Sequence, residues 1–104
     1  MHVPNRFEIR DRDWELTQRA YGMDDEGWDR RLVAQRLSAL GERLALPVLD
    51  LTPALLEAER GVFGGPYYVY DPHWNALGHR VVAGELERFL REKAWIPDCA
   101  GRRR

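Results

Sequence analysis

A carboxylate and an imidazole lie two residues apart in the segment Asp71-Pro72-His73. An aspartate that accepts a hydrogen bond from one imidazole nitrogen fixes the tautomer of the ring and leaves the other nitrogen free to take a proton. Pro72 holds its own φ at about -65° and favours an extended Asp71, so the geometry between Asp71 and His73 is stiffer than in an ordinary loop. The segment therefore predicts a general base, His73, oriented by Asp71.

A structural interpretation of the same residues stays open, because Asp-x-His alone is a weak pattern. A capped loop with a surface Asp71 and with His73 packed beside Trp74 would give the same letters. A metal site that also uses His79 is not predicted. Its six-residue separation from His73 turns the two rings about 120° apart on a helix, whereas zinc-binding pairs use four-residue spacing.

The elements around this segment predict an α/β pattern. Val3, Phe7 and Ile9 recur at even steps, as on one face of a strand over residues 3–9. Residues 48–51 are a short apolar run of the kind found in a buried parallel strand. Residues 67–70 are aromatic and β-prone, and they lead into the Asp-His segment.

Helices are predicted between and after these extended segments. One runs over residues 14–21, capped by Asp11 or Asp13 and ended by Gly22. The others are residues 32–44 behind an acidic first turn at 24–29, residues 52–60 with Thr52 as N-cap and Gly61 as the end, and residues 76–93 capped by Asn75. Helix, strand and helix in succession are the order of a crossover unit.

Composition limits the classes of function. A chain of 104 residues with a net charge of -1 forms one domain at most and lacks the basic surface of a nucleic-acid or anionic-membrane binder. The single cysteine, Cys99, excludes an intrachain disulfide. The sequence predicts neither a signal peptide nor a membrane-spanning segment, and its localisation stays unassigned. We expect residues 1–96 to form a single partial domain and residues 97–104 a flexible basic tail.

Residues 46–90 resemble the C-terminal part of an SGNH (GDSL-like) hydrolase, in the branch related to alginate O-acetyltransferases and DHHW-type proteins. The similarity rests on the stretches LPVLDLTPAL, YYVY, DPHWNALGH and RVVAGELERFL. It implies a partial doubly wound, flavodoxin-like three-layer α/β fold with about two parallel strands and three to four helices. It also implies that His73 and Asp71 belong to a Ser-His-Asp triad, with Trp74, Asn75 and Gly78 supporting the site by ring packing, helix capping and close helix approach.

The nucleophile of such a triad is missing from the chain. Ser38, the only serine, lies within the helical pattern of residues 32–44 and lacks a glycine turn that would expose its hydroxyl. Gly64 and Gly65 are expected to be loop residues rather than oxyanion donors. Cys99 has no His nearby in the sequence that could activate it as a nucleophile.

Two functions follow from these observations. In the first, the chain is part of an acyl-ester hydrolase or O-acyltransferase that needs no cofactor. It acts on an acyl ester or an acetylated carbohydrate, and a complementing upstream segment or partner supplies the serine. In the second, it is a non-catalytic truncated α/β module that forms a homodimer or complements a partner through an open sheet edge. Both lead us to expect that the isolated chain neither turns over a simple acetyl ester nor reacts with a fluorophosphonate.

Overall fold

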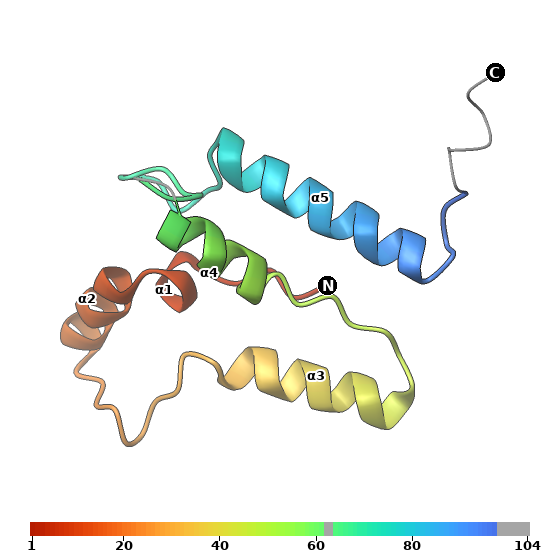
Figure 1. Ribbon diagram of the computed structural model, residues 1–104. Coiled ribbons are helices and arrows are strands. Elements are labelled where there is room, and N and C mark those ends of the chain that lie inside the picture. The colour runs from red at the N-terminus through yellow and green to blue at the C-terminus, as the bar shows by residue number, and fades with distance from the viewer. Residues whose placement is uncertain (62–63, 98–104) are drawn as a thin grey trace.

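The computed structural model describes residues 1–61 and 64–97, and within them the chain forms five helices separated by loops (Figure 1). The α4 and α5 helices lie side by side, and the N-terminal segment with α1 crosses next to α4. The α3 helix lies on the other side of that segment. The helices are α1 (Arg6–Ile9), α2 (Asp11–Tyr21), α3 (Leu32–Leu44), α4 (Thr52–Gly61) and α5 (Ala76–Glu92).

The strand expected over residues 3–9 is instead the short helix α1. Asn5 and Glu8 form a capping box, in which the Asn5 side chain accepts from the first turn and the Glu8 carboxylate accepts from the Asn5 N–H at 2.5 Å. An Asn followed by a Glu three residues later is a helix-start signal. Here it outweighs the even spacing of Val3, Phe7 and Ile9.

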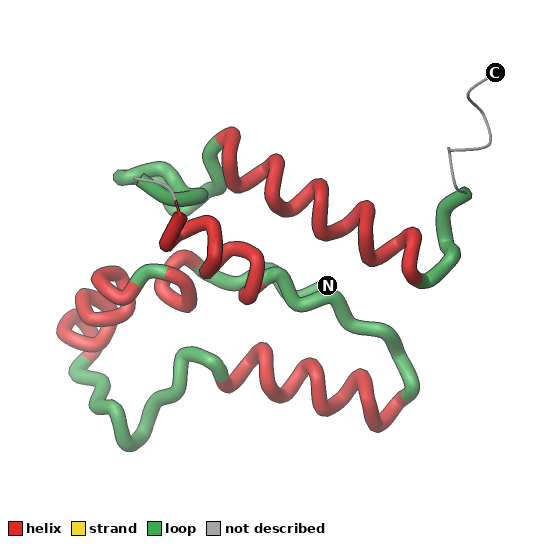
Figure 2. Tube along the Cα trace, in the orientation of Figure 1, coloured by secondary structure: helices red, strands yellow, loops and turns green. Residues whose placement is uncertain are grey.

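The α/β prediction is wrong, because the described residues contain no sheet (Figure 2). Residues 48–51 are extended, but their pairing is limited to one isolated parallel bridge between His2 and Asp50. His2 donates to the Leu49 carbonyl at 2.7 Å and accepts from the Leu51 N–H at 3.2 Å. The ladder stops there, because Pro4 has no N–H to donate and the chain then turns into α1. The doubly wound, flavodoxin-like three-layer fold and its open sheet edge are therefore not found.

The predicted helices are confirmed, with differences at their starts. Gly22 ends α2 in the left-handed conformation with φ 62°. Arg10, rather than an aspartate, is the N-cap of α2. The acidic residues 24–29 form a loop before α3. At α4 the Asp50 carboxylate accepts from the Thr52 N–H at 2.9 Å, so Asp50 rather than Thr52 provides a side-chain acceptor at the start of this helix.

The core lies between α1, the extended segment 48–51, α4 and α5. Its buried members are Ile9, Leu49, Leu51, Leu55, Tyr67 and Val82. The α3 helix contributes little to this core, since only Ala34 and Gly41 of that helix are buried. Gly41 lies against Val48, where a Cβ would come within 2.5 Å of Val48 Cγ2. Among the described helices, none is long and apolar enough to cross a membrane.

Candidate functional site

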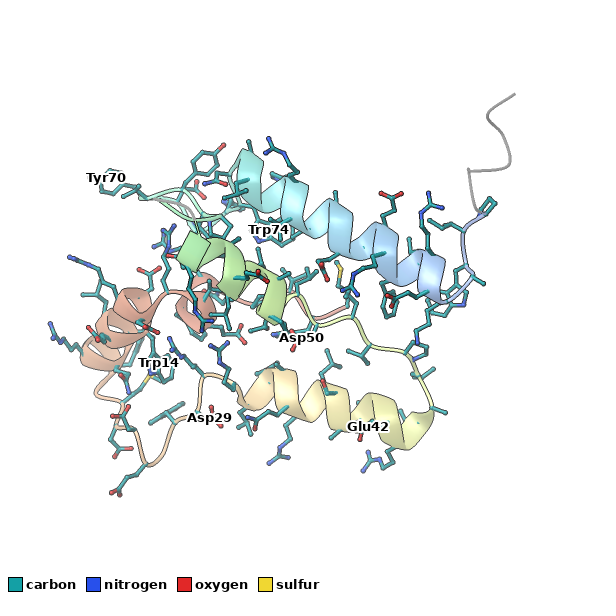
Figure 3. The ribbon with its side chains drawn as sticks, in the orientation of Figure 1. Trp14, Asp29, Glu42, Asp50, Tyr70 and Trp74 are labelled. Carbon is teal, nitrogen blue, oxygen red and sulfur yellow. The ribbon has the colours of Figure 1, made fainter. Side chains whose placement is uncertain are left out.

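The Asp-His segment lies in a loop, residues 64–75, that joins the α4 end of the molecule to α5; we call it the site loop. Its two sides are held together by an isolated antiparallel bridge between Tyr67 and Trp74. The Tyr68 N–H donates to the His73 carbonyl at 3.2 Å, and the Asn75 N–H donates to the Pro66 carbonyl at 2.9 Å. The residues between these bonds form the exposed tip, from which Tyr70 projects into solvent (Figure 3).

Two arginines from the start of the chain bind the backbone of the site loop. Arg6 Nη1 donates to the carbonyls of Tyr68, Val69 and Asp71 at 3.0, 3.1 and 3.2 Å. Arg10 Nη2 donates to the carbonyls of Gly64 and Tyr67 at 2.5 and 3.1 Å. The two arginines are four residues apart and so lie on one side of the α1 turn.

Each of these arginines is itself held by a carboxylate. Arg6 Nε lies 2.5 Å from Asp13, and Arg10 Nε donates to Glu59 at 2.9 Å. The Arg10 guanidinium also lies 5.6 Å from the centre of the Tyr67 ring. Burial raises the pKa of Tyr67 to about 12, so its hydroxyl stays neutral in the physiological range. The site loop is thus fixed to α1 and α4 by charge-assisted contacts.

Asp71 and His73 contact each other as the sequence predicted. Asp71 Oδ1 accepts from the backbone N–H of His73 at 2.8 Å, and the same oxygen contacts His73 Nδ1. The backbone hydrogen bond from His73, then that from its ring, lower the pKa of Asp71. Both side chains are open to solvent, with 56% of Asp71 and 82% of His73 exposed. The Asp71 carboxylate therefore both closes an Asx turn with the His73 backbone and contacts the His73 ring.

Trp74, Asn75 and Gly78, which the resemblance implies as support for the site, follow His73 at the end of the site loop and the start of α5. The side-chain oxygen Oδ1 of Asn75 accepts from the Gly78 N–H at 3.0 Å and caps α5, while its side-chain Nδ2 donates to the Gly65 carbonyl at 2.8 Å. At Gly78 a Cβ would come within 2.3 Å of the Pro66 carbonyl oxygen, so α5 approaches the loop more closely than any larger residue allows. Trp74 packs edge to face with His79 at 5.5 Å.

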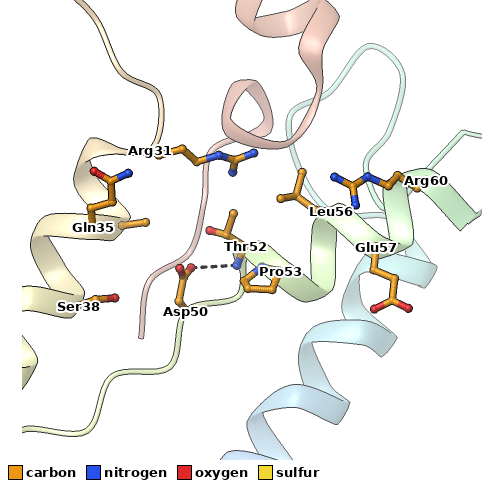
Figure 4. Close-up of a pocket in the computed structure, with 10 residues that line it drawn as sticks. Arg31, Gln35, Ser38, Asp50, Thr52, Pro53, Leu56, Glu57 and Arg60 are labelled. Atoms are coloured by element: carbon orange, nitrogen blue, oxygen red, sulfur yellow. Dashed lines mark hydrogen bonds between the residues drawn. The ribbon is translucent and has the colours of Figure 1, made fainter.

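Ser38 is not brought to His73. It lines a cavity of about 750 Å³ between α3 and α4, together with Asp50 and Thr52, and neither Asp71 nor His73 borders that cavity (Figure 4). Gly64 and Gly65 adopt positive φ angles of 86° and 60° in the site loop. Cys99 and the rest of the tail from residue 98 lie outside the described residues, and so does part of the predicted basic tail.

A metal ion has no obvious ligands in the part of the chain that the structure describes. Within residues 1–61 and 64–97, no group of three or more His, Cys, Asp or Glu side chains is placed to hold one. What the site loop offers is proton transfer. With Nδ1 turned to Asp71, the other ring nitrogen of His73 is the one available to an incoming hydroxyl.

The two arginines were not identified from the sequence. Their hydrogen bonds to the site loop join residues 54 to 65 positions apart, and no local pattern indicates such pairs. Their four-residue spacing becomes informative only if residues 6–9 are taken as a helix. Comparison of the chain with protein-family models, with curated proteins and with solved structures finds no match.

Proposed function

We propose that this chain supplies the general base of an acyl-ester hydrolase or O-acyltransferase, with His73 as the base, Asp71 as its orienting carboxylate, and the nucleophilic serine supplied by another polypeptide segment. The observation that carries the proposal is the contact of Asp71 Oδ1 with His73 Nδ1 on a loop fixed by Arg6 and Arg10. The resemblance of the DPHWNALGH stretch to SGNH hydrolases supports the same roles.

The proposed step uses the free nitrogen of His73. It takes the proton of the serine hydroxyl as the oxygen attacks the acyl carbon, and Asp71 stabilises the imidazolium that forms. The ester C–O bond then breaks, and the imidazolium returns the proton to the departing alkoxide. Water or an acceptor hydroxyl removes the acyl group by the same sequence in reverse order. The high exposure of His73 is what an incoming segment would require.

The test measures ester cleavage with p-nitrophenyl acetate, by the chain alone and by the chain expressed with the segment encoded upstream of Met1. Alone, the chain should give no turnover and no fluorophosphonate labelling. With a segment that carries a Gly-Asp-Ser-like turn, activity should appear and should fall about a hundredfold or more in His73→Ala. His79→Ala is the matched control, because His79 is also exposed and lies close by on α5. Labelling of Ser38, or full activity of His73→Ala, would refute the assignment.

A second candidate function, a self-associating module, is favoured by the exposed apolar face of α3. Val33, Leu40 and Leu44 are 64%, 40% and 53% exposed. With Leu37 they are spaced by four, three and four residues, a pattern that is the same in both directions along the helix. An antiparallel α3 from a second copy could therefore match it residue for residue. Sedimentation should then show a dimer that Leu40→Glu converts to a monomer; a wild-type monomer at high concentration excludes this function.

A further inference from the structure

Arg31 and Arg60 point toward each other across Leu56, although they come from opposite sides of a cavity (Figure 4). Arg31 directly precedes α3 and Arg60 lies near the end of α4. Arg31 Nη1 is buried without a hydrogen-bond partner. Two facing guanidinium groups repel each other, and a buried N–H without an acceptor costs free energy. An oxyanion between them would remove both penalties.

Several arginines gather around this point. Arg31, Leu56 and Arg60 border both the 750 Å³ cavity and a second cavity of about 490 Å³, which lies toward the start of α2. Five arginines and two carboxylates line the second cavity. Two arginines are paired, Arg10 with Glu59 and Arg30 with Asp11. Three have no ion pair among the described residues, and these are Arg12, Arg31 and Arg60.

Two carboxylates also line the first cavity, but neither forms an ion pair with Arg31 or Arg60. Asp50 accepts a hydrogen bond from the Thr52 N–H at 2.9 Å. Glu57 points away from the Arg60 guanidinium in Figure 4 and makes no ion pair within the described residues. Five arginines and four carboxylates border the two cavities together, which leaves a net charge of +1. Arg31 and Arg60, which have no ion pair among the described residues, suit the two negative charges of a phosphate monoester, whose oxygens match the forked donors of arginine.

The wall on the α4 side offers contacts for the organic part of such a ligand. Thr52 is 5% exposed, and its hydroxyl is buried without a hydrogen-bond partner, while its backbone N–H donates to Asp50. Gln35 and Ser38 add polar groups, and Pro53 adds an apolar surface. The cavity has the volume of an ordinary small-molecule site. We propose that this groove, bordered by Arg31, Leu56 and Arg60, binds a small phosphate monoester, with the phosphate between the two arginines and the organic part beside Thr52.

This site shares no residue with the Asp71–His73 pair and does not depend on the function proposed for that pair. The groove is bordered by the start of α3 and by α4, whereas the pair lies on the site loop at the start of α5. The binding of a phosphate monoester there is a separate activity of the chain.

The experiment titrates the full chain with inorganic phosphate and with glycerol 3-phosphate, following backbone amide shifts by NMR at constant ionic strength. Saturable shifts should appear at residues 31, 52 and 54–60. Arg31→Gln and Arg60→Gln should each weaken phosphate binding by about tenfold to a hundredfold. Arg36→Gln is the matched control, because Arg36 is exposed on α3 and lines neither cavity. It should bind as the wild type does.

Thr52→Val separates the two parts of the site. It should weaken binding of glycerol 3-phosphate and leave that of inorganic phosphate unchanged. Arg60→Gln alters an exposed side chain and should keep the wild-type spectrum elsewhere, so loss of binding there reports on the ligand rather than on folding. The proposal is overturned if phosphate shifts do not saturate, if acetate binds as tightly as phosphate, or if both Arg31→Gln and Arg60→Gln bind like Arg36→Gln.

Discussion

Replacing Arg10 with Met should destabilise the protein strongly, because one guanidinium connects α1, α4 and the site loop. Arg10 donates to Glu59 at 2.9 Å and to the carbonyls of Gly64 and Tyr67, and it lies over the Tyr67 ring. A hydrogen bond to a charged group contributes about 1.5 to 3 kcal/mol, and a cation–π contact adds about 0.5 to 1 kcal/mol. The contacts share one side chain and are not additive, so we expect the free energy of unfolding to fall by about 3 kcal/mol.

Part of that loss comes from the carboxylate left behind. The Glu59 side chain is 25% exposed and its Oε2 is buried without a hydrogen-bond partner, so without Arg10 it would be a poorly solvated charge. The double variant Arg10→Met with Glu59→Met should therefore recover about 1 kcal/mol relative to Arg10→Met alone. Met keeps most of the apolar stem of both side chains, which isolates the effect of charge and hydrogen bonding.

Urea denaturation measures these differences in the free energy of unfolding. In thermal denaturation, for a domain of this size, about 3 kcal/mol corresponds to a fall of roughly 10 to 20 °C in Tm. Arg12→Met is the matched control, since Arg12 is exposed, lies two residues away and makes no ion pair within the described residues. It should change stability by less than about 0.5 kcal/mol. If Arg10→Met is no less stable than Arg12→Met, Arg10 does not hold the site loop.

Two further predictions concern the same loop. Gly78→Ala should lower the free energy of unfolding by about 1 to 3 kcal/mol, because the added Cβ would lie 2.3 Å from the Pro66 carbonyl oxygen. The control is Gly84→Ala on the same helix, where a Cβ would have nothing within 4 Å and should stabilise α5 by up to about 1 kcal/mol. Urea denaturation measures both changes. Because hydrogen bonds from His73 lower the pKa of Asp71, the stability it contributes is fully present above about pH 4 and lost as pH falls through its folded pKa. A carbon-13 NMR titration should find that pKa below the ordinary value in the wild type and still below it in His73→Ala, which keeps the backbone donor; an ordinary value in the wild type would contradict this.

Helix positions could be predicted from the sequence because their signals are local. The apolar spacing of residues 32–44, the left-handed Gly22 and the Asn75 cap each depend on neighbours within one or two turns. The contact between Asp71 and His73 is equally local, since two residues and a proline restrict it. These features needed no knowledge of the rest of the chain.

The sheet could not be predicted correctly because a strand is defined by its partners. Residues 48–51 have the apolar composition of a buried parallel strand, yet within residues 1–61 and 64–97 a single residue, His2, pairs with them. The strand predicted over residues 3–9 was inferred from alternate apolar positions, whereas Asn5 and Glu8 specify a helix over part of that segment. A capping box satisfies backbone hydrogen-bonding groups within its own segment, whereas a strand needs a neighbouring strand to do so. In a segment as short as the four residues of α1, the capping box therefore outweighs the alternating apolar pattern.

The convergence of Arg31 and Arg60 was also beyond the sequence pattern. Thr52 was expected to cap α4, and in that role its hydroxyl would have been occupied. Instead Thr52 is the first residue of the helix, its N–H donates to the Asp50 side chain, and its hydroxyl is unpartnered at the cavity wall. A change of one or two residues at a helix start thus decides whether a polar group is part of the scaffold or available to a ligand.

Asp71→Asn can separate the structural interpretation of Asp71 from the catalytic one. Oδ1 accepts from both the backbone N–H and the ring of His73, so Asp71→Ala would remove the turn and the orienting carboxylate together. Asparagine keeps an oxygen for the turn and removes the charge that stabilises the imidazolium. We expect Asp71→Asn to keep the wild-type amide exchange of residues 64–75 and to lower the activity reconstituted with a serine-bearing segment by about a hundredfold or more. If activity persists while the loop stays ordered, Asp71 serves the turn alone, and the general-base proposal loses its orienting group.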